Sequence, residues 1–311
     1  MVQLNRWKEY EVITGENPDV FKFIFKNDDA IAETVLYKYP TFEKRTVMCI
    51  STQTGCPMGC SFCGTGKFFG RNLHHEEIVE QVDVMIDHFG LDLNASERTQ
   101  IMFMSMGEPL LNFYELEIAI RIFHRDFPKT ALLVSSSGPY TKAWEDFMTL
   151  ASEVPTIGLQ FSVHESTNGA RDRLIPMKAK MCLQQIAFTG WEFMQTTRRK
   201  PFFNYCVHAE NATDEDVERL FELFHPNVWE ATLSVICTPD ESAEAVKHNL
   251  DLINEFSGKL VAKGYNTRVF NPAGQDDIGG GCGQLWQVQA FAAEHPEMLR
   301  QSPGDKMRER A

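Results

Sequence analysis

The chain has 311 residues, of which 43% are hydrophobic and 23% charged, as is typical of a soluble globular protein. It carries 30 basic and 43 acidic residues, which gives a formal net charge of −13. This acidity argues against a generic nucleic-acid coat, because such binding needs positive charge spread over a surface. The first residues contain no apolar segment of a secretory signal, and no stretch is apolar for the length of a membrane span. We therefore expect a cytoplasmic protein.

From residue 46 onward, short β-branched or apolar runs alternate with segments of helical periodicity. The predicted strands are 46–51, 100–104, 131–135, 156–163, 202–208, 231–237 and 267–271. The predicted helices are 76–88, 115–127, 142–151, 183–194, 214–224 and 243–263. This alternation is typical of a parallel sheet covered by helices, so we expect an α/β fold, either doubly wound or a full or partial barrel. Chemistry in such folds gathers at the carboxyl ends of the strands.

The same pattern suggests how the chain is divided. Residues 1–45 precede the alternation and are interpreted as a small N-terminal appendage. Residues 46–285 form the expected core, and residues 286–311 a helical tail with a charged end. No Pro/Gly-rich linker marks a second large domain.

The cysteines are unevenly distributed. The chain has eight, too few for a disulfide scaffold, and four of them lie between residues 49 and 63. Cys56, Cys60 and Cys63 follow the first predicted strand with the spacing C-x3-C-x2-C. Three thiolates leave one position of a four-iron cluster open, and an iron with an open position can bind substrate. This stretch is therefore predicted to hold iron.

A structural zinc site is the alternative interpretation of these cysteines. Zinc needs a fourth ligand, which His74 or His75 would supply. The iron–sulfur interpretation is favoured because the loop ends the first strand of a β/α series and carries an aromatic residue, Phe62, just before its last cysteine.

Polar residues mark the ends of the next predicted strands. Gly107 and Glu108 follow the second strand, Ser135 ends the third, and Ser162 to His164 end the fourth. Glycine lets the backbone approach a ligand, and a glutamate accepts hydrogen bonds from an amino group. Hydroxyl and imidazole groups at these positions would hold a ribose or a carboxylate. A turn, a capping serine and a buried histidine are the structural alternatives for the same residues.

Taken in order, these motifs resemble the RlmN/Cfr class of radical S-adenosylmethionine methyltransferases, which methylate adenine in RNA. The similarity runs from residue 21 to residue 285. It includes Glu-Thr-Val-Leu at 33–36, Cys-Ile-Ser at 49–51, the cysteine loop, Met-Gly-Glu-Pro-Leu-Leu-Asn at 106–112, Ser-Ser-Ser-Gly at 135–138, Phe-Ser-Val-His at 161–164 and Cys-Gly-Gln-Leu at 282–285. The resemblance implies a partial (β/α)6 TIM-like radical SAM barrel with a short N-terminal appendage.

The resemblance also implies two cofactors. A [4Fe-4S] cluster would be held by Cys56, Cys60 and Cys63, and its free iron would bind S-adenosyl-L-methionine. One electron, from a donor such as flavodoxin or ferredoxin, would cleave that molecule to a 5′-deoxyadenosyl radical. The expected contacts to S-adenosylmethionine are Gly107, Glu108, Ser135, Ser162, Val163, His164 and Thr238.

The resemblance also implies catalytic roles for three further residues. Cys282 would carry a methyl group that is delivered to adenine C2 of ribosomal or transfer RNA. Cys49 would then attack the sulfur of Cys282 and form a disulfide as the product leaves, since disulfide exchange needs a thiolate and a second sulfur within reach. Glu33 occupies the place of the family's acid/base carboxylate, which removes the substrate proton.

The chain departs from the family pattern in three ways. Only 55 residues precede Cys56, so we expect the family's N-terminal helical RNA-binding domain to be missing. Thr238 and Pro239 replace an Asn-Pro pair. The negative charge is unfavourable for RNA, although basic residues gather at 67–71, 178–180, 198–200 and 306–310. The same chemistry on a small molecule or peptide, and a non-catalytic iron–sulfur protein, therefore remain alternatives.

Overall fold

A 10-stranded sheet forms the centre of the computed structural model, which describes residues 4–235, 243–270, 278–279, 284–285 and 287–302. The strands follow one another across the sheet in the order β1-β2-β3-β4-β7-β8-β9-β10-β11-β12. Their bounds are β1 Glu9–Thr14, β2 Val20–Lys26, β3 Ile31–Lys38, β4 Thr46–Ile50, β7 Thr99–Phe103, β8 Ala131–Ser136, β9 Ile157–Ser162, β10 Phe202–Val207, β11 Glu230–Val235 and β12 Thr267–Phe270.

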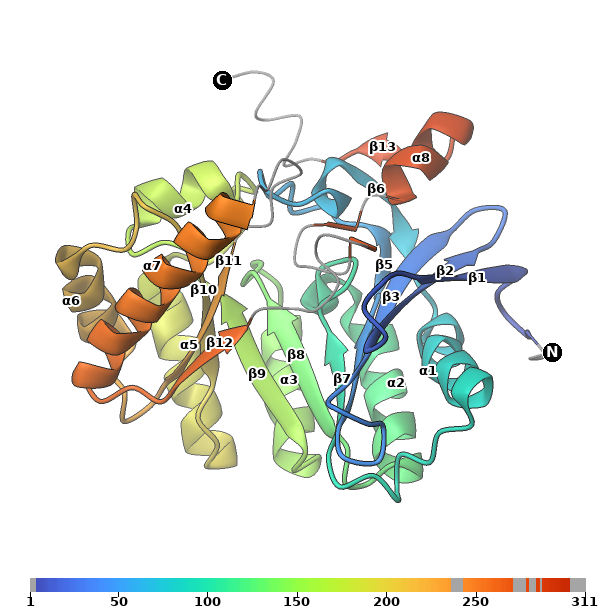
Figure 1. Ribbon diagram of the computed structural model, residues 1–311, viewed down its shortest axis with the longest axis horizontal. Coiled ribbons are helices and arrows are strands. Elements are labelled where there is room, and N and C mark those ends of the chain that lie inside the picture. Colours follow the sequence, from blue (N-terminus) through green and yellow to red (C-terminus); the bar gives the residue numbers. More distant parts are fainter. Residues whose placement is uncertain (1–3, 236–242, 271–277, 280–283, 286, 303–311) are drawn as a thin grey trace.

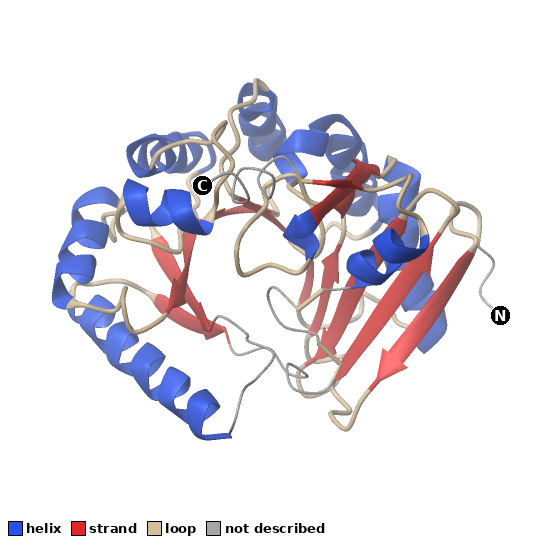
Figure 2. Ribbon diagram, turned by 90° about the horizontal axis from the view of Figure 1, so that it is seen from above, coloured by secondary structure: helices blue, strands red, loops and turns tan. Residues whose placement is uncertain are grey.

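In this sheet, the seven adjacent strands from β4 to β12 are parallel to one another. The helices that connect them are α1 His75–Phe89, α2 Phe113–Asp126, α3 Ala143–Glu153, α4 Asn168–Leu174, α5 Leu183–Thr197, α6 Asp214–Leu223 and α7 Ala243–Ala262. Seen from above, the strands form an open arc with helices along its convex side (Figures 1 and 2). The expected partial (β/α)6 barrel is confirmed, with β12 added after α7.

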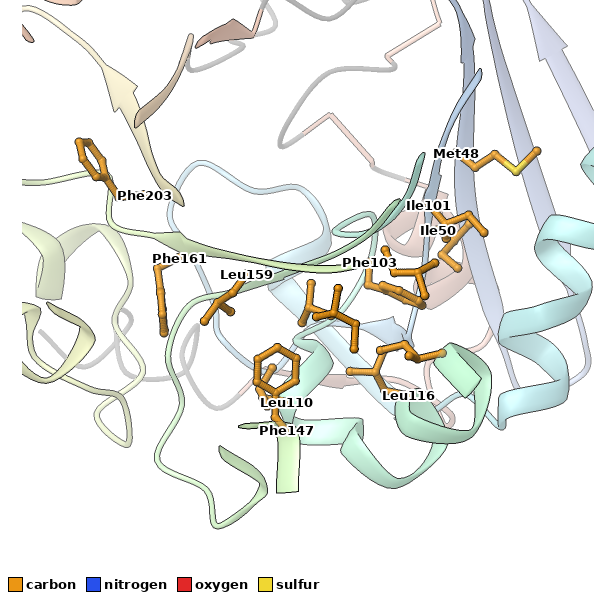
Figure 3. Close-up of a cluster of buried hydrophobic side chains, with 14 of the residues drawn as sticks. Met48, Ile50, Ile101, Phe103, Leu110, Leu116, Phe147, Leu159, Phe161 and Phe203 are labelled. Carbon is orange, nitrogen blue, oxygen red and sulfur yellow. The ribbon is translucent and has the colours of Figure 1, made fainter. Parts of the chain in front are cut away.

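Hydrophobic side chains fill the layer between the sheet and the helices. Ile101 and Phe103 of β7 point from the sheet toward Leu116 of α2 (Figure 3). The chain forms these helices where apolar residues recur at helical spacing and where end signals agree with it. In α1, for example, His74 and Glu77 make a capping box and Gly90 ends the helix with φ 62°.

The N-terminal strands extend the same sheet. β1, β2 and β3 are antiparallel, and β3 pairs with β4 so that Val35 lies opposite Cys49. Both faces of β3 are buried. On one face the hydroxyl of Thr34 donates to Gln81 of α1, and the other face is covered by α8, Gln287–Glu294. The segment interpreted as an appendage is thus continuous with the core sheet.

A second, small sheet lies above the carboxyl ends of the barrel strands (Figure 1). It contains β5 Gln53–Gly55, β6 Phe68–Asn72 and β13 Arg300–Gln301, in the order β13-β6-β5. Two short 3-10 helices, η1 Thr65–Lys67 and η2 Pro109–Asn112, complete the described elements. None of the helices in the described part of the chain is long and apolar enough to cross a membrane.

Candidate active site

The cysteine loop follows β5 and is fixed by backbone hydrogen bonds. The N–H of Cys56 donates to the carbonyl of Phe68 (2.8 Å), and the N–H of Ser61 donates to that of Leu174 (2.9 Å). Burial raises the pKa of the Cys56 and Cys63 thiols. Bound iron would oppose this effect, because a metal ligand is held as the thiolate.

One cavity of about 90 Å³ brings the cysteine loop and the strand ends together. The predicted residues that line it are Cys56, Cys60, Cys63, Gly107, Glu108, Ser135, Ser162 and His164. Val163 differs from these residues, because its side chain is fully buried and packs in the hydrophobic core. Thr238 lies outside the described residues.

Glu108, in the wall of this cavity, joins the segments that follow β7 and end β8. One carboxylate oxygen accepts from the hydroxyl of Ser136 (2.7 Å) and the other from the N–H of Ser137 (2.7 Å). The side chain is only 2% exposed, and this burial raises its pKa to about 7. Gly107 has φ 103°, and a Cβ there would lie 2.8 Å from the side chain of Gln53. Glycine is therefore required at this turn.

His164 presents an unused polar atom in the cavity wall. Its side chain is 3% exposed, and its Nδ1 atom meets no hydrogen-bond partner within the described residues. Its φ of 61° is unusual for a residue with a Cβ, and its ring packs edge-on against Phe62. Burial and the charge of Arg171 lower its pKa to about 3, so the ring is neutral at physiological pH. A buried polar atom without a partner fits a site built for a ligand.

The zinc alternative gains no support from the two candidate histidines. His75 Nδ1 lies 2.7 Å from a carboxylate oxygen of Glu115, and His74 caps α1. Neither is among the residues that line the cysteine cavity. In the described ranges, no three His, Cys, Asp or Glu side chains are close enough to hold one metal ion. A four-iron cluster does not require such a group, since each cysteine binds a different iron.

Glu33 lies on the face of the sheet that α8 covers. Its carboxylate is fully buried and lies 2.5 Å from the Nζ of Lys22. The N–H of Gln287 donates to its Oε1 atom (2.8 Å), while its backbone carbonyl accepts from the hydroxyl of Ser105 (2.6 Å). Burial raises the pKa of Glu33, and the charge of Lys22 opposes this shift. A carboxyl in these surroundings can hold a proton at a pH where an exposed glutamate is ionised.

Cys49 faces the same side of the sheet as Glu33. It lies opposite Val35, and Val35 shares a face with Glu33 because side chains alternate along a strand. The half-buried Cys49 packs in an apolar cluster that also contains Ile278 and Leu285. The structure therefore brings Cys49 and Glu33 under one segment of the chain.

That segment flanks Cys282, which itself lies outside the described residues. On one side of it, the Nζ of Lys22 donates to the carbonyl of Gly279 (3.3 Å). On the other side, the hydroxyl of Thr65, next to the cysteine loop, donates to the carbonyl of Leu285 (3.0 Å). The described neighbours of Cys282 are thus anchored beside Glu33 and beside the cysteine cavity.

Two residues of this region were not identified from the sequence. Asn204 of β10 lines the cysteine cavity, accepts a hydrogen bond from Ser234 (2.9 Å) and accepts the N–H of His164 on its carbonyl. Lys22 partners Glu33. Each is a polar residue inside an otherwise apolar strand, which is the signal that could have revealed it.

Comparison with known proteins identifies the family of the chain. The sequence pattern of the Radical SAM superfamily matches residues 50–253. A probable dual-specificity RNA methyltransferase RlmN of Fervidobacterium nodosum is 34% identical over 205 residues, which are 65% of this chain and 57% of that protein. The ribosomal RNA large subunit methyltransferase N of Nitrosopumilus maritimus is 31% identical over 291 residues, or 89% of this chain and 80% of its own.

Solved structures give the same fold. A radical SAM methyltransferase from Sphaerobacter thermophilus superposes with a TM-score of 0.72 at 26% identity, covering 88% of this chain and 80% of that one. Streptococcus suis SuiB bound to S-adenosylmethionine superposes with a TM-score of 0.52 at 12% identity, covering 74% of this chain and 51% of that one, and supports the fold alone. The chain belongs to the radical SAM superfamily and, within it, to the RlmN-type RNA methyltransferase family.

Proposed function

We propose that this protein methylates adenine C2 in RNA by way of a methyl group carried on Cys282. The observation that carries the proposal is the shared face of β3 and β4. There Cys49 and Glu33 lie under the residues that flank Cys282, next to the cavity of the cysteine loop. A methyl carrier, a resolving thiol and a proton acceptor must meet at one place, and this face is adjacent to the cysteine cavity.

Cys56, Cys60 and Cys63 would hold a [4Fe-4S] cluster, and the cavity beside them would take S-adenosylmethionine. Once bound, these cofactors supply one-electron chemistry that can remove a hydrogen atom from a methyl group. The protein's own part is to exclude water and to orient. Gly107 lets the backbone come close, and the Nδ1 atom of His164, which has no partner among the described residues, offers one hydrogen bond.

Cys49 would release the methylated product. Its thiolate attacks the sulfur of Cys282, an S–S bond forms, and the bond between that sulfur and the transferred carbon breaks. The electron pair of that broken bond stays with the carbon, which takes up a proton. The position of Cys49 in a strand suits this role, because a strand holds the attacking sulfur in place while the carrier segment approaches.

Glu33 would remove the proton from the adenine carbon that is methylated. Its raised pKa brings a buried carboxyl toward the range in which it can both accept and return a proton. Lys22 stabilises the ionised form and thereby keeps the carboxyl able to accept.

The experiment follows the methyl label through the protein. The chain is reconstituted without oxygen and supplied with methyl-labelled S-adenosylmethionine. Peptide mass spectrometry then locates the label, and total RNA from an expressing host is digested for nucleoside analysis. We expect label on Cys282 and an increase in 2-methyladenosine. Label on Cys282 without any increase in 2-methyladenosine would contradict the RNA substrate.

Cysteine variants separate the two thiol roles. Cys49→Ala should accept the label and then accumulate a covalent protein–RNA adduct, because nothing releases the carrier. Cys282→Ala should accept no label. Cys182→Ser is the matched control, since Cys182 caps α5 and a hydroxyl can take over the cap. Wild-type turnover by Cys49→Ala would overturn the assignment of Cys49.

A further inference from the structure

A second cavity, of about 600 Å³, occupies the interior of the barrel arc. Its lining includes residues at the starts of the parallel strands, at the end of the sheet opposite to the cysteine loop. Five of the described lining residues are cationic, namely Arg45, Arg98, Arg199, Lys200 and Arg268, and none is Asp or Glu. The whole chain has a net charge of −13, so a lining with five cationic and no acidic residues differs clearly from the average composition of the protein.

Two of these cations, Arg45 and Arg98, form no ion pair with a carboxylate within the described part of the chain, and they directly precede β4 and β7. Arg268 pairs with Glu230 on the neighbouring strand (3.1 Å), and the Nη2 atom of Arg45 donates to the side chain of Gln100 (2.8 Å). The Nε atom of Arg45 is buried without a hydrogen-bond partner there. Burial lowers the pKa of Arg45, as do the charges of Arg98 and Arg268. Like charges held together in this way are typical of a site that receives an anion.

Aromatic rings are interleaved with the arginines. The guanidinium of Arg45 lies over the ring of Tyr39 with its carbon 5.0 Å from the centroid. The guanidinium of Arg268 lies 4.5 Å from the centroid of Phe202. Both rings line the cavity. Basic side chains for phosphates beside aromatic rings for bases are what a single-stranded nucleic acid recognises, whereas an acidic peptide uses the charges alone.

The basic cavity leads toward the candidate active site. Met104 and Asn204 line both this cavity and the cavity of the cysteine loop. Arg98 directly precedes β7 and Met104 directly follows it, so the two are six positions apart, or roughly 20 Å in extended backbone. The length fits a looped-out stretch of RNA better than one flipped base.

The basic runs seen in the sequence are mostly engaged within the protein. Lys180 pairs with Asp172, and Arg71 pairs with Asp29 and Glu77. Arg199, although it lines the cavity, donates to the backbone carbonyl of Ala151. Arg45, Arg98 and Arg268 are scattered in the sequence and are brought together only by the fold.

We infer that Arg45, Arg98 and Arg268 bind the phosphates of the RNA substrate and that the barrel interior guides an unpaired segment of this RNA toward the cysteine cavity. This inference rests on the proposed function, because it assigns the route by which that substrate enters. It places RNA recognition on the barrel itself.

The test compares the triple variant Arg45→Gln, Arg98→Gln, Arg268→Gln with the wild type. Fluorescence anisotropy measures binding of a labelled RNA hairpin that has an adenosine in its loop, at several salt concentrations. Each lost phosphate contact should lower the slope of log affinity against log salt by about 0.7, so the triple variant should lose about 2 and bind about 100-fold more weakly at 0.1 M salt. The single variants guard against a folding defect in the triple variant.

The control removes three arginines from the outside of the molecule. Arg6, Arg121 and Arg125 pair with surface carboxylates, and replacing all three by Gln changes the net charge by the same amount. We expect the wild-type slope. A slope reduced equally in the control would overturn the inference, as would equally tight and equally salt-dependent binding of polyglutamate.

Two measurements keep this inference separate from the proposed function. If the wild type forms 2-methyladenosine and the cavity variant retains both activity and slope, the entry route is wrong and the function stands. If only the cavity variant loses slope while no 2-methyladenosine forms, RNA binding at the cavity stands and the methylation proposal is wrong. If the wild type neither binds the hairpin nor raises 2-methyladenosine, both are wrong.

Discussion

Lys22 and Glu33 form an ion pair of 2.5 Å in which only 4% and 0% of the two side chains are exposed. The pair lies on adjacent antiparallel strands beneath the segment that flanks Cys282. Two charges removed from water are stable only as a pair, since neither can be solvated alone. The candidate proton acceptor is therefore fixed in place by its counter-ion.

Replacing Glu33 alone should show that the buried ion pair is stable only when both charges are present. Glu33→Gln leaves the Lys22 ammonium buried without a charged partner, and we expect the free energy of unfolding to fall by about 3–5 kcal/mol. The double variant Lys22→Met, Glu33→Gln should recover most of that loss. Urea unfolding followed by circular dichroism measures both, and a double variant no more stable than the single one would contradict the pairing.

Glu108 should make stability depend on pH. Its pKa is about 7 in the fold and about 4.5 in the unfolded chain, so the folded state keeps the proton to higher pH. The resulting stabilisation is complete below pH 4.5 and is lost as the pH rises to 7, a change on the order of 3 kcal/mol. Glu108→Gln is neutral at every pH and therefore lacks this pH dependence. Unfolding of both cofactor-free proteins across this range should show that the stability of the wild type falls relative to that of the variant as the pH rises. Parallel curves would refute the prediction.

His164 should affect ligand binding more than folding. Glycine adopts the left-handed backbone at this position without strain but supplies no polar atom in place of the imidazole Nδ1. We expect His164→Gly to weaken binding of S-adenosylmethionine to the reconstituted protein by roughly 3- to 10-fold, the effect of one hydrogen bond. Isothermal titration calorimetry gives the affinity. An unchanged affinity, with an unchanged unfolding midpoint, would remove His164 from the site.

Two helical glycines should respond oppositely to alanine. A Cβ at Gly190 in α5 would lie 2.0 Å from the ring of Trp229, whereas one at Gly258 in α7 meets none of the described residues within 4 Å. Gly190→Ala should destabilise the protein by about 1–3 kcal/mol or more. Gly258→Ala should stabilise it by about 0.5–1 kcal/mol through helix propensity. Thermal unfolding distinguishes the two, and a stabilised Gly190→Ala would show that α5 packs differently.

The core of the fold could be predicted from the sequence because its signals are local. The predicted strands at 46–51 and 100–104 correspond to β4 and β7, and the helix at 76–88 corresponds to α1. Each has a clear period and an end signal within a few residues. The cysteine loop and the polar strand ends could also be predicted to meet, because parallel strands bring their carboxyl ends together.

The remaining features depend on contacts across the chain. β2 and β3 are buried on both faces, so they lack the alternation that marks a strand with one exposed face. The hydrogen bond from the N–H of Gln287 to the carboxylate of Glu33 joins residues 254 positions apart, so no local sequence pattern could predict it. Arg45, Arg98 and Arg268 are far apart in the sequence. A basic patch can be recognised in a sequence only where basic residues are close together along the chain, so these three could not be grouped in advance.

The position of α8 has a consequence for how the protein is made. This helix supplies the bond to Glu33, and Gln289 donates to the carbonyl of Gly64 beside the cysteine loop, 225 residues earlier. A ribosome releases the barrel strands before α8, and domains begin to fold as they emerge. The cysteine loop is therefore synthesised before the helix that binds it at Gly64. Iron and sulfide can reach the three cysteines during this interval, before Gln289 fixes the loop.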